Sequence, residues 1–278
     1  MRETIEFRIP EDRAAMFLEP GLGTSLGGTV RKVVLPRDDP RVKLIGDLER
    51  EFHKRERSFF YGWHISRRYT RKELEAAQLL QLLIRPTFEP PGEMSGTEYD
   101  ESAACPHCGA GATLKGDLHL DLQRIPKKKD LALTIAGEAV VSAQLVKALR
   151  DHGMTGAEYR PVRHKTGVVS KEWRHLVITS SPVDIIPPTR VGTKPFDLDE
   201  QGGYRCPLRH VAGLNRLSEL WVRHAGADGS DWIRTRQLIG TRRGVLRPEA
   251  QLLISPRLYR LLVNLKAKRF EIEVAHWA

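Results

Sequence analysis

The placement of three cysteines constrains the fold of this chain more than any other feature, because they are the only cysteines among its 278 residues. Cys105 and Cys108 enclose two residues in the segment Cys-Pro-His-Cys-Gly, and Cys206 opens a second segment that ends at His210. Two thiols with this spacing can bind one Zn²⁺, and the following glycine lets the backbone turn beneath the metal. Cys206 and His210 would complete a tetrahedral shell. We therefore predict a closed, structural zinc site joining two distant segments.

The four residues Cys-Pro-His-Cys also occur as the active-site dithiol of thioredoxin-fold thiol-disulfide oxidoreductases. In those enzymes the first cysteine caps a helix, whose positive end lowers the pKa of the thiol. Here Gly-Ala-Gly-Ala-Thr follows Cys108, which favours a turn into a strand over the start of a helix. The sequence therefore favours a metal site, and an oxidoreductase that uses Cys105 and Cys108 is the alternative.

Composition indicates a folded protein with a basic surface. Hydrophobic residues make up 40% of the chain, and the mean hydropathy is -0.39, which permits a substantial core. No stretch approaches the roughly 18 apolar residues of a membrane span, and the N-terminus lacks an apolar signal segment. We therefore expect a cytoplasmic protein that does not enter membranes. The formal net charge of +10 favours polyanions or an acidic protein as partners.

Alternating apolar residues predict strands in the first quarter of the chain. The alternation is clear at residues 5–9, and residues 30–35 form a second apolar run. Between residues 59 and 65, every second residue is aromatic or isoleucine, which predicts a strand with one buried face. A stacking platform for single-stranded nucleic acid is the alternative for this aromatic segment, since arginines flank it.

Capping residues predict two helices in the same region. Asp39, followed by proline, is typical of a helix N-terminus, and the apolar spacing carries this helix to about Glu56. Thr70 and Glu73 form a capping box. The leucines that follow predict that this second helix continues through Leu82.

These elements predict an α+β fold with mixed and antiparallel sheets and a zinc-ribbon-like knuckle. We expect an N-terminal α+β region at residues 1–100 and a second α+β region, which contains the zinc ribbon, at residues 101–278. The proline-rich stretch before the first cysteine pair separates them.

We expect an internal repeat in the second region, in residues 140–162 and 253–275. Laying Ser142 on Ser255, a shift of 113 positions (255 − 142), aligns two segments that each predict a strand, a serine-capped helix and a strand. Coincidence between two amphipathic helices is the alternative to duplication.

The two cysteine segments and residues 246–276 together resemble the double-CxxCG paralogous proteins of myxobacteria. Both cysteines and the glycine of residues 105–109 match the first motif of that family, and Cys206 opens the second. Arg209 stands where the family pattern places its fourth cysteine, and we expect His210 to replace it as a ligand. The resemblance implies a small cytoplasmic immunity protein, which neutralises a toxin delivered between kin cells.

The leading hypothesis is thus a non-enzymatic, zinc-stabilised binding protein whose partner is a protein, such as a toxin or effector. We see no nucleophile-base arrangement and no phosphate-binding glycine loop, although the sequence does not settle the question of activity. The alternative is a zinc-ribbon protein that binds nucleic acid. Its candidate contacts are arginines around a glycine-flanked turn: Arg234, Arg236, Arg242, Arg243 and Arg247.

Overall fold

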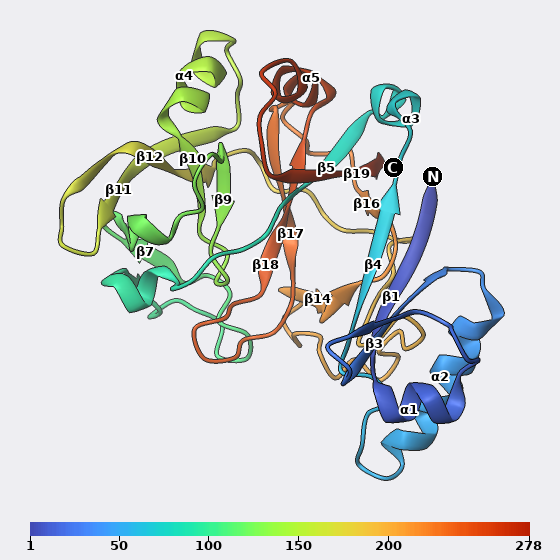
Figure 1. The fold of residues 1–278 in the computed structure, drawn as a ribbon. Helices are drawn as coiled ribbons and strands as arrows, with labels where there is room; N and C mark the ends of the chain where they lie inside the picture. The colour runs from blue at the N-terminus through green and yellow to red at the C-terminus, as the bar shows by residue number, and fades with distance from the viewer.

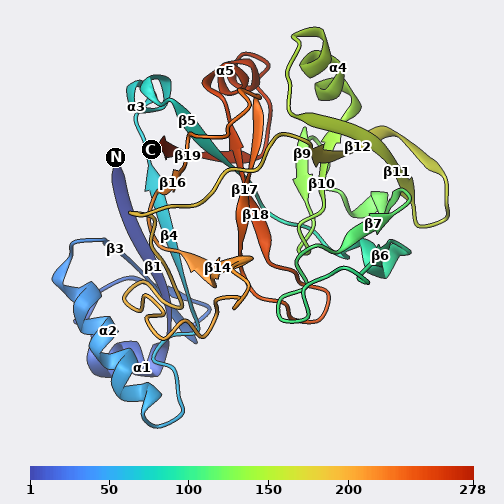
Figure 2. The ribbon, with the colours of Figure 1, turned by 180° about the vertical axis from the view of Figure 1, so that it is seen from behind.

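The computed structural model describes residues 1–278 and has an α+β fold with mixed and antiparallel sheets, as the sequence predicted. Three sheets of four, six and five strands lie side by side, with the N-terminal sheet at one end and the third sheet at the other (Figures 1 and 2). None of the helices is both long and apolar enough to cross a membrane.

The N-terminal sheet has the strand order β2-β3-β1-β4. Its elements are β1 (Arg2–Pro10), α1 (Glu11–Phe17), β2 (Thr24–Leu26), β3 (Val30–Pro36), α2 (Pro40–His53) and β4 (Gly62–Arg68). Ile5, Phe7 and Ile9 are fully buried in the core of this unit, which confirms the first predicted strand. The Asp39 side chain accepts a hydrogen bond from Arg41 N–H, which confirms the predicted helix cap.

The central sheet has the order β14-β17-β18-β5-β19-β16. Its strands are β5 (Leu79–Ile84), β14 (Val211–Gly213), β16 (Leu220–Val222), β17 (Trp232–Ile239), β18 (Glu249–Ile254) and β19 (Phe270–Trp277). β5 pairs with β18 on one side and with β19 on the other. The sheet therefore combines β5, which precedes residue 100, with five strands that follow it. From the sequence we expect a boundary between two regions at residue 100.

The predicted helix through Leu82 is wrong in its second half. The capping box of Thr70 and Glu73 is present, but the helix it opens, α3 (Arg71–Ala76), ends before the leucines of residues 79–83. Those leucines belong to β5, in which five of six residues are buried. A strand covered on both faces is apolar throughout, so its pattern can be mistaken for a helix.

The aromatic strand also begins later than predicted. Phe59 and Phe60 are buried ahead of β4, and the strand starts at Gly62. Tyr61 is 72% exposed, so it does not share the buried face with Ile65.

The third sheet has the order β8-β11-β12-β10-β9. Its strands are β8 (Leu118–Leu120), β9 (Leu131–Leu133), β10 (Ala139–Ser142), β11 (Ala157–His164) and β12 (Val169–Ile178). Helix α4 (Ala143–Asp151) follows β10, and α5 (Pro256–Asn264) follows β18. Ser142 and Ser255 cap these helices by accepting hydrogen bonds from Leu145 N–H and Leu258 N–H. Both predicted strand-helix-strand units are therefore present.

The likeness between the two units extends to whole sheets. The order β9-β10-β12-β11-β8 matches β17-β18-β5-β19-β16, and every corresponding pair has the same parallel or antiparallel sense. Arg160 pairs with His175 in one sheet, and Glu273, 113 positions after Arg160, pairs with Gln81 in the other. The central strand comes from different places in the chain, since β12 follows β11 whereas β5 precedes the entire second unit.

Each unit also binds the loop that follows the helix of the other. Asp130, just before β9, accepts a hydrogen bond from Lys268 N–H at 3.0 Å. Asp231, just before β17, accepts one from Thr155 N–H at 3.0 Å. Thr155 and Lys268 are again 113 positions apart (268 − 155). The two helices pack into one shared core, which includes Leu145, Leu149, Leu258 and Leu262.

Two short ladders complete the fold. β6 (Glu98–Asp100) pairs with β7 (Thr113–Lys115), and β13 (Val191–Gly192) pairs with β15 (Asn215–Arg216). The loop between β6 and β7 carries the first cysteine pair.

Candidate metal centre

The four residues predicted as metal ligands lie together. One candidate ligand atom from each of Cys105, Cys108, Cys206 and His210 lies within 4.8 Å of the others, so the cluster can hold a metal ion. The Sγ atoms of Cys105 and Cys206 are 3.7 Å apart, and His210 Nδ1 is 3.8 Å from both Cys108 Sγ and Cys206 Sγ. All three thiols are buried and none forms a disulfide.

Backbone hydrogen bonds shape the first cysteine turn. Cys105 N–H donates to Ala110 O, and Gly109 N–H donates back to Cys105 O, both at 2.8 Å. Gly109 has a φ of 72°, in the left-handed region that favours glycine. The chain then enters β7, so the predicted turn into a strand is confirmed and no helix begins at these cysteines.

The second turn has a related pattern. Cys206 N–H donates to Val211 O at 3.2 Å, and Arg209 N–H donates to Cys206 O at 2.8 Å. Arg209 itself adopts a φ of 62° and is exposed, so it occupies a turn position outside the cluster. Leu238 N–H donates to His210 O at 2.8 Å, which attaches this turn to β17. The fourth candidate ligand is therefore His210, one residue after Arg209, and its imidazole lies beside the sulfurs.

Burial and backbone amides act in opposite directions on the thiols. Burial raises the pKa of Cys108 to about 12, against the opposing effect of a hydrogen bond from Ala110 N–H. Burial also acts to raise the pKa of Cys206, but hydrogen bonds from the His210 and Leu208 amides and from the other two cysteines together lower that pKa. A bound metal cation adds positive charge that converts coordinating thiols to thiolates.

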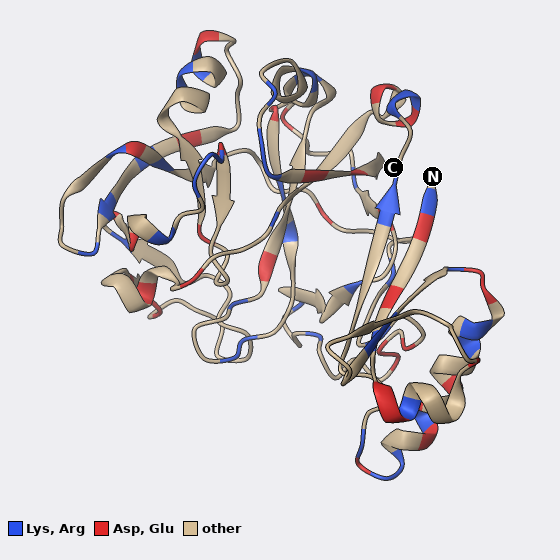
Figure 3. Cartoon of the chain, viewed as in Figure 1, with Lys and Arg blue, Asp and Glu red and all other residues tan.

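In the view of Figure 3, lysines and arginines are spread over all three sheets and do not gather in one part of the molecule. Among the five arginines of the nucleic-acid hypothesis, Arg236 pairs with Asp184 at 3.0 Å. Arg234 and Arg243 form no ion pair and are exposed. Fewer of these five arginines are therefore free to contact nucleic acid than the sequence indicates.

Two of these arginines hold their turn against the metal centre. Arg242 pairs with Glu101 at 2.7 Å, and Arg247 pairs with Glu101 at 2.8 Å and with Glu93. The Arg242 guanidinium also lies against Gly109, where an added Cβ would come within 3.0 Å of Nη1. Both side chains therefore stabilise the loop that carries the first two cysteines.

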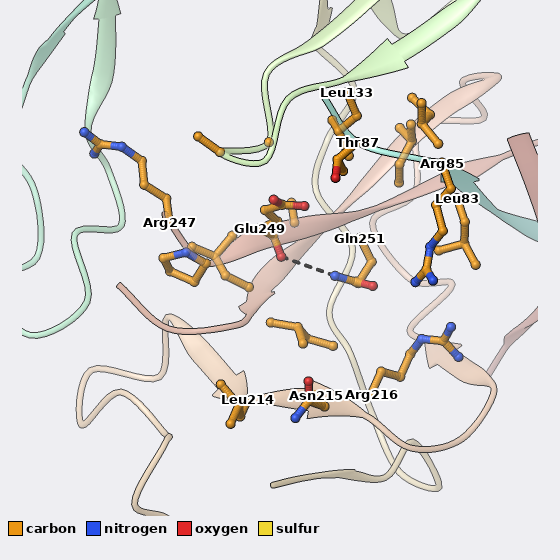
Figure 4. Close-up of a pocket in the computed structure, with 18 of the residues that line it drawn as sticks. Leu83, Arg85, Thr87, Leu133, Leu214, Asn215, Arg216, Arg247, Glu249 and Gln251 are labelled. Carbon is orange, nitrogen blue, oxygen red and sulfur yellow. Dashed lines mark hydrogen bonds between the residues drawn. The ribbon is translucent and has the colours of Figure 1, made fainter. Parts of the chain in front are cut away.

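A cleft of about 1270 Å³ lies next to the metal centre and was not predicted from the sequence. Residues 109–112 form part of its lining, together with β4, β5, β12 and β18. Figure 4 shows Glu249 and Gln251 next to each other, and Arg85 and Arg216 extending toward each other. Burial, together with the charge of Glu138, raises the pKa of Glu249 to about 7.

The central strands of both units contribute polar residues to this cleft. Gln81 and His175 occupy corresponding positions on β5 and β12, and each has a buried side-chain atom without a hydrogen-bond partner, Oε1 and Nδ1 respectively. The one sequence signal for the cleft was Gln81, a polar residue inside the apolar run Leu-Leu-Gln-Leu-Leu-Ile.

The Glu249→Gln variant is expected to be more stable than the unaltered chain at pH 8 and equally stable near pH 4.5. The folded chain keeps a proton on Glu249 up to a pKa of about 7, whereas the unfolded chain loses it near the ordinary value of 4.5. The contribution of Glu249 to stability therefore falls as the pH rises through this interval. Urea unfolding at both pH values measures the effect, with Glu172→Gln, at an exposed glutamate without an ion pair, as the control. A constant difference between variant and unaltered chain would contradict it.

The cluster could thus be predicted from the three cysteines and the spacing between Cys105 and Cys108. The cleft could not, because strands that are distant in the sequence form it. Residues 62–65 and 81–85, for example, line it from two different sheets. Comparison of the chain with protein-family models and with curated proteins finds no match.

Proposed function

We propose that this chain is a zinc-stabilised, non-enzymatic binding protein. The observation that carries the proposal is the closed cluster of three thiols and one imidazole. A tetrahedral Zn²⁺ with Zn–S bonds of about 2.3 Å places two sulfurs about 3.8 Å apart, and Cys105 Sγ and Cys206 Sγ are 3.7 Å apart. Four protein ligands fill a tetrahedral shell and leave no position for a substrate, as in structural zinc sites.

The surroundings of the cysteines support zinc over dithiol redox chemistry. A reactive dithiol of the thioredoxin type gains its low pKa from a helix N-terminus. Here the cysteine pair lies in the loop of the β6–β7 hairpin, and no helix begins at it. A hairpin whose loop carries two metal ligands, opposed by a second ligand-bearing turn, is the arrangement we propose as zinc-ribbon-like.

The proposed partner is a protein. The resemblance to the myxobacterial double-CxxCG proteins supports an immunity role in the cytoplasm, in which the chain holds a toxin or effector in an inactive complex. The net charge of +10 favours an acidic contact surface on that partner. Nucleic acid is less well supported, because Arg236, Arg242 and Arg247 are already engaged with carboxylates.

Metal analysis tests the zinc proposal directly. The purified chain is expected to contain about one zinc per molecule, and cobalt substitution is expected to give the absorption spectrum of a tetrahedral site with three thiolates. His210→Cys is expected to retain the metal, because it supplies a fourth thiolate, whereas His210→Ala loses affinity. A folded chain without metal, or an unchanged metal affinity in His210→Ala, would refute the four-ligand site.

A further inference from the structure

Strand β4 leaves one edge of the N-terminal sheet unpaired. It is the last strand in the order β2-β3-β1-β4 and pairs only with β1. Arg37 N–H donates to Glu3 O on the β3 side of β1, so the alternation of an antiparallel ladder directs the even-numbered residues of β1 toward β4. Their partners on β4 are also even-numbered. The amides and carbonyls of Trp63, Ile65 and Arg67 therefore point away from β1.

This free edge lies along the central cleft. The cleft of about 1270 Å³ and a neighbouring cavity of about 310 Å³ share His64, Ile65 and Arg67 on the β4 side and Leu83 and Glu273 on the side of the central sheet. In both ribbon views β4 is the strand of its sheet nearest the central sheet (Figures 1 and 2). The larger cavity exceeds the roughly 300 to 1,000 Å³ of a typical small-molecule site. Seven extended residues span about 23 Å, so a short strand matches the length of β4.

The lining of the two cavities carries excess positive charge. Seven lysines and arginines face five glutamates: Arg67, Arg68, Arg85, Lys194, Arg216, Arg234 and Arg247 against Glu49, Glu138, Glu249, Glu271 and Glu273. Four of these cations form ion pairs with carboxylates, whereas Arg68, Arg85 and Arg234 form none. Arg85 has no acidic partner, and its only hydrogen bond is with His64 Nδ1 at 3.5 Å. Arg67 is 8% exposed and pairs with Glu3 and Glu273, but its Nη2 atom has no hydrogen-bond partner.

We infer that β4 and the cleft beside it accept an extended, acidic segment of a partner protein as an added strand. Main-chain pairing with Trp63, Ile65 and Arg67 would supply affinity, and alternate carboxylates of the segment would meet Arg85 and the other arginines that lack an ion pair. This inference rests on the proposed function as a binding protein, and it names the site and the chemistry of the partner. An unpaired edge strand is otherwise a hazard for aggregation, which an occupant removes.

Random nonapeptides displayed on phage are the probe for this site. Selection on the purified, metal-loaded chain is expected to enrich acidic sequences that lack proline, and synthetic copies are expected to bind more weakly as salt is raised. N-methylation of the alternate peptide amides that face β4 is expected to abolish binding, whereas N-methylation of the intervening amides does not. Enrichment of basic or proline-rich peptides, or of none, would overturn the inference.

Two protein measurements place the peptide on β4. Arg85→Glu is expected to weaken binding at least about tenfold, since it sets like charges against each other. Lys171→Glu changes the net charge equally at an exposed residue outside both cavities, and it is expected to bind normally. In hydrogen exchange, the peptide should protect the amides of Trp63, Ile65 and Arg67. Protection elsewhere would overturn the inference.

Controls separate this site from its alternatives. If the chain alone forms dimers in which the β4 amides are protected, the occupant is a second copy and the inference fails. The zinc content of each variant is measured in parallel. If the unaltered chain contains its full complement of zinc but binds no peptide, the β4 site alone is rejected. If the unaltered chain contains no zinc, the proposed function is rejected.

Discussion

The Cys206→Ser variant is expected to lose its zinc and to unfold at a much lower temperature than the unaltered chain. Cys206 is 6% exposed, and it links the second turn to the β6–β7 hairpin across the cluster. A structural zinc site can contribute on the order of 10 kcal/mol to folding, while the stability of a whole domain is about 5 to 15 kcal/mol. Loss of the metal therefore removes most of the stability of this region. Thermal unfolding followed by circular dichroism, with metal analysis of the same sample, measures the effect.

The matched control is His107→Ala. His107 lies within the same turn as Cys105 and Cys108, but it is exposed and outside the cluster. It is expected to keep both the metal and the melting temperature. A strong chelator should reproduce the Cys206→Ser result in the unaltered chain, and unchanged melting on metal removal would show that the cluster does not stabilise the fold.

The features predictable from sequence were those set by short-range chemistry. A helix cap needs one side-chain oxygen and an amide two or three residues away, so Asp39, Thr70, Ser142 and Ser255 were all recognisable and all act as caps. The cluster of three cysteines and His210 was recognisable for a related reason. Soft ligands are few in this chain, and the spacing between Cys105 and Cys108 already fixes half of the shell.

The features that were missed depend on contacts between distant segments. Apart from Gln81, residues 79–84 are apolar on both faces because two cores cover them. The run itself does not indicate that β18 and β19 are its neighbours. The repeat at a shift of 113 positions was visible in sequence only as far as its strand-helix-strand units. Its full extent was hidden, because the central strands β5 and β12 occupy different places in chain order.

Asp231→Ala is expected to lower the free energy of unfolding by about 3 kcal/mol, because it leaves several partners of a buried carboxylate unsatisfied. Asp231 is 4% exposed and accepts hydrogen bonds from Thr155 N–H at 3.0 Å and Ser255 Oγ at 2.6 Å. It also pairs with Arg257 at 3.1 Å. The same carboxylate thus fixes the cap of its own helix and holds the loop of the other unit. Urea unfolding monitored by tryptophan fluorescence measures the loss.

The other strand-helix-strand unit supplies the control for this substitution. Asp130 is the corresponding residue of the other unit, but it is only half-buried, its bond from Ser142 Oγ is longer at 3.3 Å, and it has no ion pair. Asp130→Ala is therefore expected to cost about 1 kcal/mol. Equal losses in the two variants would show that the burial of Asp231 and its pair with Arg257 add nothing. A negligible loss in both would show that the crossed contacts between the units do not hold them together, so the shared core of α4 and α5 would have to do so alone.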